Sequence, residues 1–260
     1  MKVVEADEKN RILEYLKKDI ANCIYLYLDI LNYGISTDNV TVWMEEDHQG
    51  IQWIMMKYYD SFQIYSRNTL YELENILHLI QTHRVSMISG PKSIIQQIEK
   101  KCGLYHASYG EIFLMDHYRK IDSGHPIEKA KEADAREIAE LICGDPEIGG
   151  HYEAENLAAQ LADRIRTGTG RSYIIRESGN IAAHSAAYAE TRDIAVVGGT
   201  IVSPDYRNTD YYLLLSNYLL QELLKKGKRV YTFAVSSKMI NYHKLLHKKC
   251  GEYGKLELIK

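Results

Sequence analysis

Apolar residues recur along the chain with the spacing of helices and strands, and the predicted elements fall into two similar runs. In the first run, residues 1–122, one side of residues 8–33 is apolar at helical spacing, which predicts two helices. The later elements of this run are a strand at 40–46, a hairpin at 51–66, a helix at 70–83, a strand at 85–89, a helix at 93–101 and a strand from 109 to 115 or 119.

The second run, residues 126–260, repeats this order of elements. It predicts a strand at 127–130, helices at 134–143 and 153–166, a hairpin of strands at 172–176 and 181–189, a strand at 194–202, a helix at 211–226, a strand at 229–235, a helix at 238–249 and a strand at 253–259. Between the runs, Ile121–Pro126 is small, polar and rich in residues that break helices, so we expect a linker there.

The repeated order favours an internal duplication, and a short echo between the halves supports it. Lys100–Gly103 and Lys248–Gly251 share the residues Lys-Lys-Cys-Gly at the same place in the order of elements. The echo also has a simpler explanation, because Lys near a helix end followed by Gly is a common helix stop.

Composition and charge narrow the class of protein. The 260 residues are 45% hydrophobic and 26% charged, as is typical of globular domains. The formal net charge of -3 does not predict a nucleic acid or an anionic membrane as partner. The four cysteines form no C-x-x-C pair and the charged N-terminus lacks a secretory signal, so we expect reduced thiols and a cytoplasmic protein.

The second run is organised around one stretch, Val202–Lys226, in which a strand ends, the chain turns at Pro204 and a long helix begins. A helix N-terminus directly after a strand presents backbone N–H groups, and such groups bind phosphate. The stretch therefore offers a ready phosphate site at this junction, and Arg207 lies in its turn.

At these residues the second half resembles the GCN5-related N-acetyltransferase (GNAT) superfamily. The resemblance rests on the opening PIEKAKEADAREIAELI, on IAVVGGTIVSPDYR with the long helix after it, and on the finish VYTFAV and HKKCG. The first half looks like a weaker module of the same kind, so the whole chain resembles the tandem GNAT proteins. The resemblance implies an α/β (α+β) fold of two GNAT-like modules, 1–122 and 126–260, each with a mixed, mostly antiparallel central sheet flanked by helices.

The resemblance also implies a site for acetyl-CoA as co-substrate. In the family, the strand before the phosphate loop splays from its neighbour, and the pantetheine arm pairs with the backbone of that strand. This strand is Ile194–Val202 here, which places Ile201 and Val202 at the cofactor. Gly198 and Gly199 would permit a close approach to its backbone.

The family's pyrophosphate loop has the pattern Q/R-x-x-G-x-G/A, and its positions fall here on Arg207, Asn208, Thr209, Asp210, Tyr211 and Tyr212. Asp210 and Tyr212 stand where small residues let the backbone meet phosphate without a Cβ in the way. A carboxylate about 4 Å from one phosphate charge costs on the order of 4 kcal/mol at an effective dielectric near 20, which argues against tight binding. Asp210 is also explained as the N-cap of the next helix, and Arg207 as a solvated or salt-bridged surface residue.

Acetyl transfer to an amine needs a base for the ammonium and an acid for the leaving thiolate. The family often places a Tyr acid in the last helix, and that position falls on His247, which is otherwise explained as a partly exposed helix residue. An unperturbed histidine has a pKa of about 6.5 and matches a thiolate less well than Tyr does. For the base, the resemblance points to Glu190 at a strand end. The position where many members carry a catalytic carboxylate falls here on Val196, which cannot accept a proton. Glu190 is equally explained by a salt bridge to Arg192 in the turn.

The histidines give no metal-binding pattern by themselves. His243 and His247 lie four residues apart on one helix face, like half of a zinc site, but Lys244 stands where a zincin helix has Glu. His184 lies alone in an apolar strand, where a histidine is most often structural.

Two hypotheses follow from these observations. The first is an acyl-CoA-dependent N-acyltransferase that moves an acetyl group to a primary amine on a small molecule or a protein. The second is a degenerate GNAT pair that has lost CoA binding and serves as a small-molecule-binding or interaction module. The family usually ends with two strands and this chain with about one, so we expect the N-terminal module or a partner chain, as in a homodimer, to supply the other.

Overall fold

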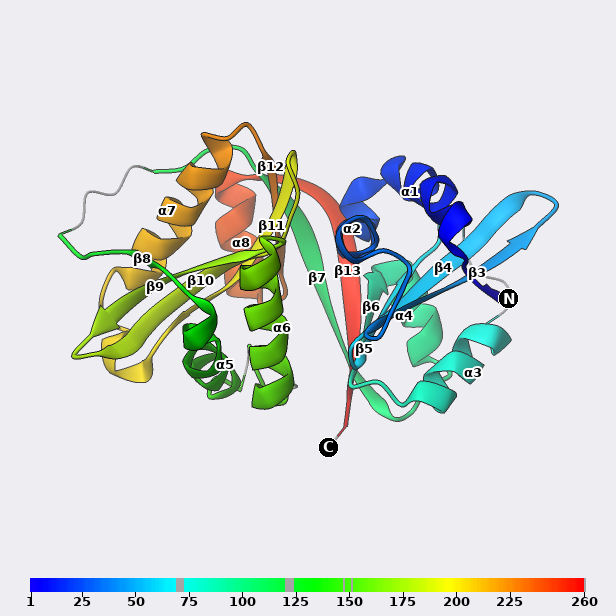
Figure 1. Cartoon of the computed structure of the whole chain (residues 1–260), viewed down its shortest axis with the longest axis horizontal. Helices are drawn as coiled ribbons and strands as arrows, with labels where there is room; N and C mark the ends of the chain where they lie inside the picture. Colours follow the sequence, from blue (N-terminus) through cyan, green and yellow to red (C-terminus); the bar gives the residue numbers. More distant parts are fainter. Residues whose placement is uncertain (69–72, 120–123, 147, 151, 260) are drawn as a thin grey trace. The chain divides into compact units, whose positions relative to one another are not determined.

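The computed structural model describes residues 1–68, 73–119, 124–146, 148–150 and 152–259, and the chain forms two compact units (Figure 1). The N-terminal unit comprises Met1–Ile112, Ala234–Tyr242 and Lys249–Lys260, and the C-terminal unit comprises Phe113–Phe233 and His243–Lys248. Residues 121–123 of the predicted linker lie outside the described part. No helix among the described residues is long and apolar enough to cross a membrane.

The N-terminal unit is built on a mixed sheet with the strand order β1-β3-β4-β5-β6-β13-β7, and β2 pairs with β3. Neighbouring strands β5 and β6 are parallel, whereas β1–β3, β3–β4, β4–β5 and β6–β13 are antiparallel. Their bounds are β1 (Lys2–Val3), β2 (Ser36–Thr37), β3 (Val40–Asp47), β4 (Gly50–Tyr58), β5 (Ser61–Tyr65), β6 (Met87–Pro91), β7 (Tyr105–Met115) and β13 (Lys248–Leu258).

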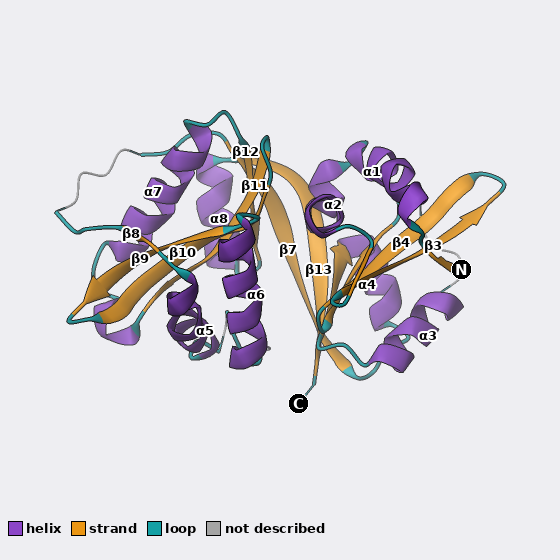
Figure 2. Cartoon of the chain, viewed as in Figure 1, coloured by secondary structure: helices purple, strands orange, loops and turns teal. Residues whose placement is uncertain are grey.

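Helices cover both faces of this sheet, as Figure 2 shows, because its strands are apolar on both faces. In β3, Val42 and Met44 join the core beneath one pair of helices, while Trp43 points to the core beneath the other pair. The first pair is α1 (Lys9–Lys17) and α2 (Ile20–Tyr33), and the second pair is α3 (Glu74–His83) and α4 (Lys92–Glu99).

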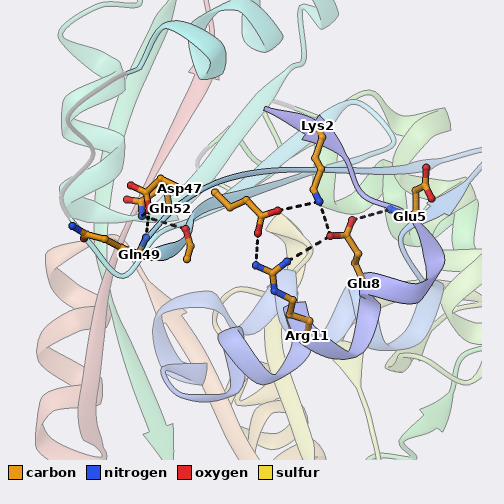
Figure 3. A network of polar contacts seen from close by, with 9 residues as sticks. Lys2, Glu5, Glu8, Arg11, Asp47, Gln49 and Gln52 are labelled. Carbon is orange, nitrogen blue, oxygen red and sulfur yellow. Dashed lines mark hydrogen bonds and ion pairs between the residues drawn. The ribbon is translucent and has the colours of Figure 1, made fainter.

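Exposed ion pairs fasten the start of the chain to this unit (Figure 3). Lys2 contacts Glu8 and Glu46, and Arg11 contacts the same two carboxylates. Each carboxylate therefore has two cations beside it, and the network joins β1 and α1 to the end of β3. We assign this network a tethering role.

The C-terminal unit has the strand order β12-β11-β10-β9-β8. The β11–β12 pair is parallel and the β8–β9, β9–β10 and β10–β11 pairs are antiparallel. The bounds are β8 (Glu128–Lys129), β9 (Arg171–Glu177), β10 (Asn180–Glu190), β11 (Ile194–Val202) and β12 (Arg229–Ala234).

Helix α7 packs on one face of this sheet and α5 and α6 pack on the other. Alternating residues of β9 separate the two cores, since Tyr173 and Ile175 face α7 and Ile174 faces α5 and α6. The helices are α5 (Ala135–Cys143), α6 (Ala154–Thr167), α7 (Tyr211–Leu224) and α8 (Ser237–Leu246). The predicted α/β class, with a mixed sheet flanked by helices, is confirmed.

The predicted equivalence of the two Lys-Lys-Cys-Gly segments is wrong. Lys100 is the C-terminal cap of α4 and Cys102–Gly103 follow in a turn. Lys248–Gly251 instead open β13, because α8 ends at Leu246. The last strand is therefore longer than the predicted 253–259, and it pairs with β6 of the N-terminal unit.

Candidate active site

The two central strands of the C-terminal unit separate halfway along their length. β11 pairs with β12 over Ile194–Val197, whose partners are Arg229–Thr232. Over Gly198–Val202, within the described residues, β11 pairs only with β10. Backbone N–H and C=O groups on that side of β11 therefore have no strand partner, so an extended ligand can pair with them. This is the splay that the resemblance implies for this strand.

A β-bulge lies in the separated part of β11. Where β10 advances from His184 to Ala186, β11 carries one additional residue. Gly199 adopts a φ of 59° in this bulge, and a Cβ there would lie 1.7 Å from the hydroxyl oxygen of Tyr188. The space that Gly199 leaves is thus filled by a tyrosine of the same sheet. Burial raises the pKa of Tyr188, so its hydroxyl stays protonated at neutral pH.

The buried side chain of His184 contacts the bulge residue Gly199 and the neighbouring strand β9. Its Nδ1 lies 3.0 Å from the carbonyl oxygen of Gly199, and its Nε2 lies 3.0 Å from the hydroxyl of Ser172. Because a carbonyl only accepts, Nδ1 is the donor, and Nε2 then accepts from Ser172. Burial lowers the pKa of His184 to about 4, against a smaller raising effect of the Gly199 bond. The sequence showed a lone histidine in an apolar strand, and only the three-dimensional structure reveals that its ring bonds to the Gly199 carbonyl.

We expect acid to weaken folding through His184. In the unfolded chain a histidine titrates near pH 6.5, so between pH 6.5 and 4 the unfolded state binds a proton that the folded state does not. This ring alone should lower the free energy of unfolding by about 2 kcal/mol from pH 7 to pH 5. Urea unfolding across this range should give a smaller pH dependence for His184→Gln than for the parent protein. Loss of the exposed ring in His48→Gln should leave the dependence unchanged, and an unchanged slope in His184→Gln would contradict the assignment.

The predicted phosphate loop follows β11 and begins with a short 3-10 turn at Pro204–Tyr206. Arg207 comes next, and its guanidinium lies 3.1 Å from a carboxylate oxygen of Asp145. Thr209 closes the loop by bonding Tyr206 through both its amide and its hydroxyl. Arg207 is exposed and its guanidinium pairs with Asp145, so an anionic ligand can compete for it. Asn208 and Thr209 are exposed beside it.

Asp210 occupies the N-cap position of α7 but makes no side-chain capping bond. The predicted N-cap position is therefore correct, but the exposed side chain does not form the hydrogen bond of a cap. The two tyrosines after it turn to the core: Tyr211 is buried and its hydroxyl donates to Glu177, while Tyr212 packs half-buried on the same core. The bond to Glu177 raises the pKa of Tyr211 to about 12.

The side chains of Ile201 and Val202 are buried on opposite faces of the sheet. Ile201 joins the core beneath α5 and α6, and Val202 joins the core beneath α7. Any contribution of these two residues to a cofactor site is therefore through their backbone groups.

Glu190 has a different environment from the one that a general base needs. Its carboxylate is buried, accepts two bonds from the Arg171 guanidinium and lies 3.1 Å from the Lys228 amine. Arg192, the predicted alternative partner, lies instead beside Asp193. The carboxylate is already engaged by two cations, so we assign Glu190 a structural role.

His247 follows α8 directly and so lies just outside the helix. The residue as a whole is partly exposed, but its side chain is only 4% exposed. Its ring lies 4.9 Å from that of His117 and 5.5 Å from that of His243, between ring centroids. Burial and the nearby His117 lower the pKa of His247, against a smaller raising effect of Asp116, and this direction disfavours the imidazolium form that an acid for the thiolate would need.

No family model matches the chain, and no curated protein matches it in sequence. Solved structures match it along nearly its full length. A Drosophila protein is 12% identical with a TM-score of 0.71, and the match covers 99% of this chain and 98% of that one. A GCN5-related N-acetyltransferase-like protein from Streptococcus suis is 13% identical with a TM-score of 0.62, over 98% of this chain and 100% of that one.

A tandem GNAT protein from the clavulanic acid biosynthesis pathway is 12% identical, with a TM-score of 0.58. The match covers 98% of this chain and 96% of that protein, so both halves of the chain have counterparts in it. At these identities the likeness concerns the fold. The chain therefore has the fold of the GCN5-related N-acetyltransferases, in the tandem form.

Proposed function

We propose that the C-terminal unit is an acyl-CoA-dependent N-acyltransferase that transfers an acetyl group from acetyl-CoA to a primary amine. The observation that carries the proposal is the separation of β11 from β12 after Val197, which leaves the backbone of Gly198–Val202 open to an extended ligand. The amide-rich pantetheine arm of the co-substrate matches such a backbone edge. The acceptor is a small molecule or a protein that presents the amine.

The groups of the chain fit acetyl-CoA at the backbone of β11 and at Arg207, and one group, the Asp210 carboxylate, opposes its binding. The open edge of β11 leads to the start of α7, and Arg207 stands in the loop between them. When bound, acetyl-CoA would supply the activated acyl group as a thioester. Arg207 would exchange Asp145 for a phosphate oxygen, while the exposed carboxylate of Asp210 would oppose the phosphate charge. Neither Glu190 nor His247 has a proton-transfer role in this proposal.

We expect Arg207→Ala to weaken acetyl-CoA binding about 10- to 100-fold, since a hydrogen bond to a charged group contributes about 1.5–3 kcal/mol. Asp145→Asn should act in the opposite direction, because it frees Arg207 from its present partner. Calorimetric titration with acetyl-CoA measures both effects. Arg192→Ala is the matched control, since Arg192 is almost fully exposed and lies on another turn.

Thermal shift gives an independent readout of the same site. At 100 times its dissociation constant, acetyl-CoA should stabilise the fold by about 2.7 kcal/mol. A protein that shows neither heat of binding nor stabilisation at millimolar acetyl-CoA does not use this site as proposed. The degenerate, non-catalytic pair would then be the better hypothesis. Release of free CoA thiol with a panel of amines tests the transfer step once binding is established.

A further inference from the structure

A cluster of metal-ligand side chains lies in the C-terminal unit, and none of its members belongs to the proposed acetyl-CoA site. Asp116 and His117 directly follow β7, and His247 directly follows α8. Each residue offers one ligand atom, and the three atoms lie within 4.8 Å of one another. We name these three residues the 116–247 cluster.

The donor set of the 116–247 cluster is one that proteins use for zinc. Two imidazoles and one carboxylate are the protein ligands of several zinc enzymes, with Zn–N and Zn–O distances of about 2.0–2.2 Å. At those lengths, the ligand atoms of a tetrahedral site lie about 3.3 Å apart. In the cluster, the Asp116 Oδ1 is 2.8 Å from the His117 Nδ1 and 3.9 Å from the His247 Nδ1. Small side-chain rotations therefore suffice to bring the three atoms around one ion.

A second observation points independently to a ligand. The Nδ1 atom of His247 is buried and has no hydrogen-bond partner among the described residues. The Asp116 carboxylate oxygen lies 3.9 Å from this atom, which is too long for a hydrogen bond. A buried polar atom without a partner costs free energy, and an ion between these two groups removes that cost.

Backbone and ring contacts with His243 fix the position of the His247 ring. The amide of His247 donates to the His243 carbonyl at 2.7 Å, which fixes the backbone just past the end of α8. The His243 ring is buried and stacks on Phe113, with 5.3 Å between ring centroids. It also contacts the His247 ring, with 5.5 Å between ring centroids. Asp116 and His117 are more than half exposed, so an ion can reach the cluster from solvent.

Glu8 and Glu46, the paired carboxylates of the network in Figure 3, offer no such site, because Lys2 and Arg11 already neutralise them. The 116–247 cluster instead combines one carboxylate with two imidazoles, a donor set that suits a divalent cation.

We propose that Asp116, His117 and His247 bind one divalent ion of the zinc class, with a water molecule in the remaining position. Such an ion would join the segment after β7 to the end of α8 and so cross-link two distant parts of the sequence. This inference concerns residues outside the acetyl-CoA site and does not depend on the proposed function.

The test uses the full chain without an affinity tag, stripped with a chelator and titrated with zinc chloride against a chromophoric competitor. We expect one ion per chain with a dissociation constant in the micromolar range or tighter. Asp116→Asn and His117→Ala should each weaken binding at least tenfold, and both positions are exposed enough to change without loss of core packing. His247→Ala should abolish binding, and His48→Ala, which removes an exposed imidazole elsewhere, should have no effect.

Cobalt gives a second readout, because a four-coordinate Co²⁺ site absorbs visible light more strongly than the hydrated ion. The parent protein should show this absorption, and Asp116→Asn should lose it. The proposal is overturned if the parent protein binds less than one zinc ion per chain at 100 µM. It is also overturned if Asp116→Asn and His117→Ala bind as tightly as the parent does.

Discussion

Gly199→Ala should destabilise the chain by about 3 kcal/mol, whereas Gly198→Ala should cost less than about 1 kcal/mol. The two glycines are neighbours on β11, but only Gly199 has a positive φ, of 59°. A Cβ at Gly199 would overlap the Tyr188 hydroxyl at 1.7 Å, while a Cβ at Gly198 would meet the Tyr188 ring at an ordinary 3.5 Å. At Gly199, the cost of overpacking and the cost of a left-handed backbone with a Cβ therefore add, whereas neither cost arises at Gly198.

Denaturant unfolding measures this difference, and a double-mutant cycle identifies its cause. Tyr188→Leu removes the hydroxyl and the distal ring, so Gly199→Ala should cost less in that background than in the parent. Equal costs in both backgrounds would show that Tyr188 does not fill the space beside Gly199. Because the bulge lies in the separated part of β11, Gly199→Ala should also weaken acetyl-CoA binding more than Gly198→Ala does.

Glu190→Gln should lower the free energy of unfolding by about 3 kcal/mol. The substitution keeps the shape of the side chain but leaves the Arg171 guanidinium and the Lys228 amine without their shared carboxylate. Both cations are mostly buried, so solvent compensates little of the loss. Asp193→Asn is the control, because the Asp193 carboxylate is 80% exposed and its removal should change stability by less than about 0.5 kcal/mol.

The same variant separates the structural role of Glu190 from the predicted catalytic one. A general base would lose turnover on substitution by Gln while the free energy of unfolding stayed near that of the parent. Normal stability with lost acetyl transfer would therefore restore Glu190 as the base. Reduced stability, with the remaining folded protein still active, would support the ion pair with Arg171 and Lys228.

Local patterns predicted most of the elements, because most helices and strands here have one or two apolar sides. The strand at Ile194–Val202 and the start of the helix at Tyr211 were placed correctly, since Pro204 and Asp210 separate two strongly apolar segments. The end of α8 was misplaced by several residues. Lys248–Gly251 read locally as a helix stop, yet pairing within the sheet makes it a strand, and such partners are invisible to a local pattern.

The candidate site was predicted less completely, because its geometry depends on contacts between distant residues. The splay of β11 followed from the resemblance, and Arg207 was located correctly in the loop between strand and helix. The two cations at Glu190 come from β9 and from the start of β12, which the sequence near Glu190 does not reveal. Likewise, His184 gains its role from Gly199 and Ser172 on the two neighbouring strands.

The position of β13 has a consequence for how the protein is made in the cell. β13 lies between β6 and β7 in the sheet of the N-terminal unit, and Leu256 pairs with Ile88. A ribosome therefore releases almost the whole C-terminal unit before the N-terminal sheet can be completed. Until then, β6 lacks one of its strand partners and presents an unpaired edge. The sheet that begins with the first residues of the chain thus cannot be completed before the last strand has been translated.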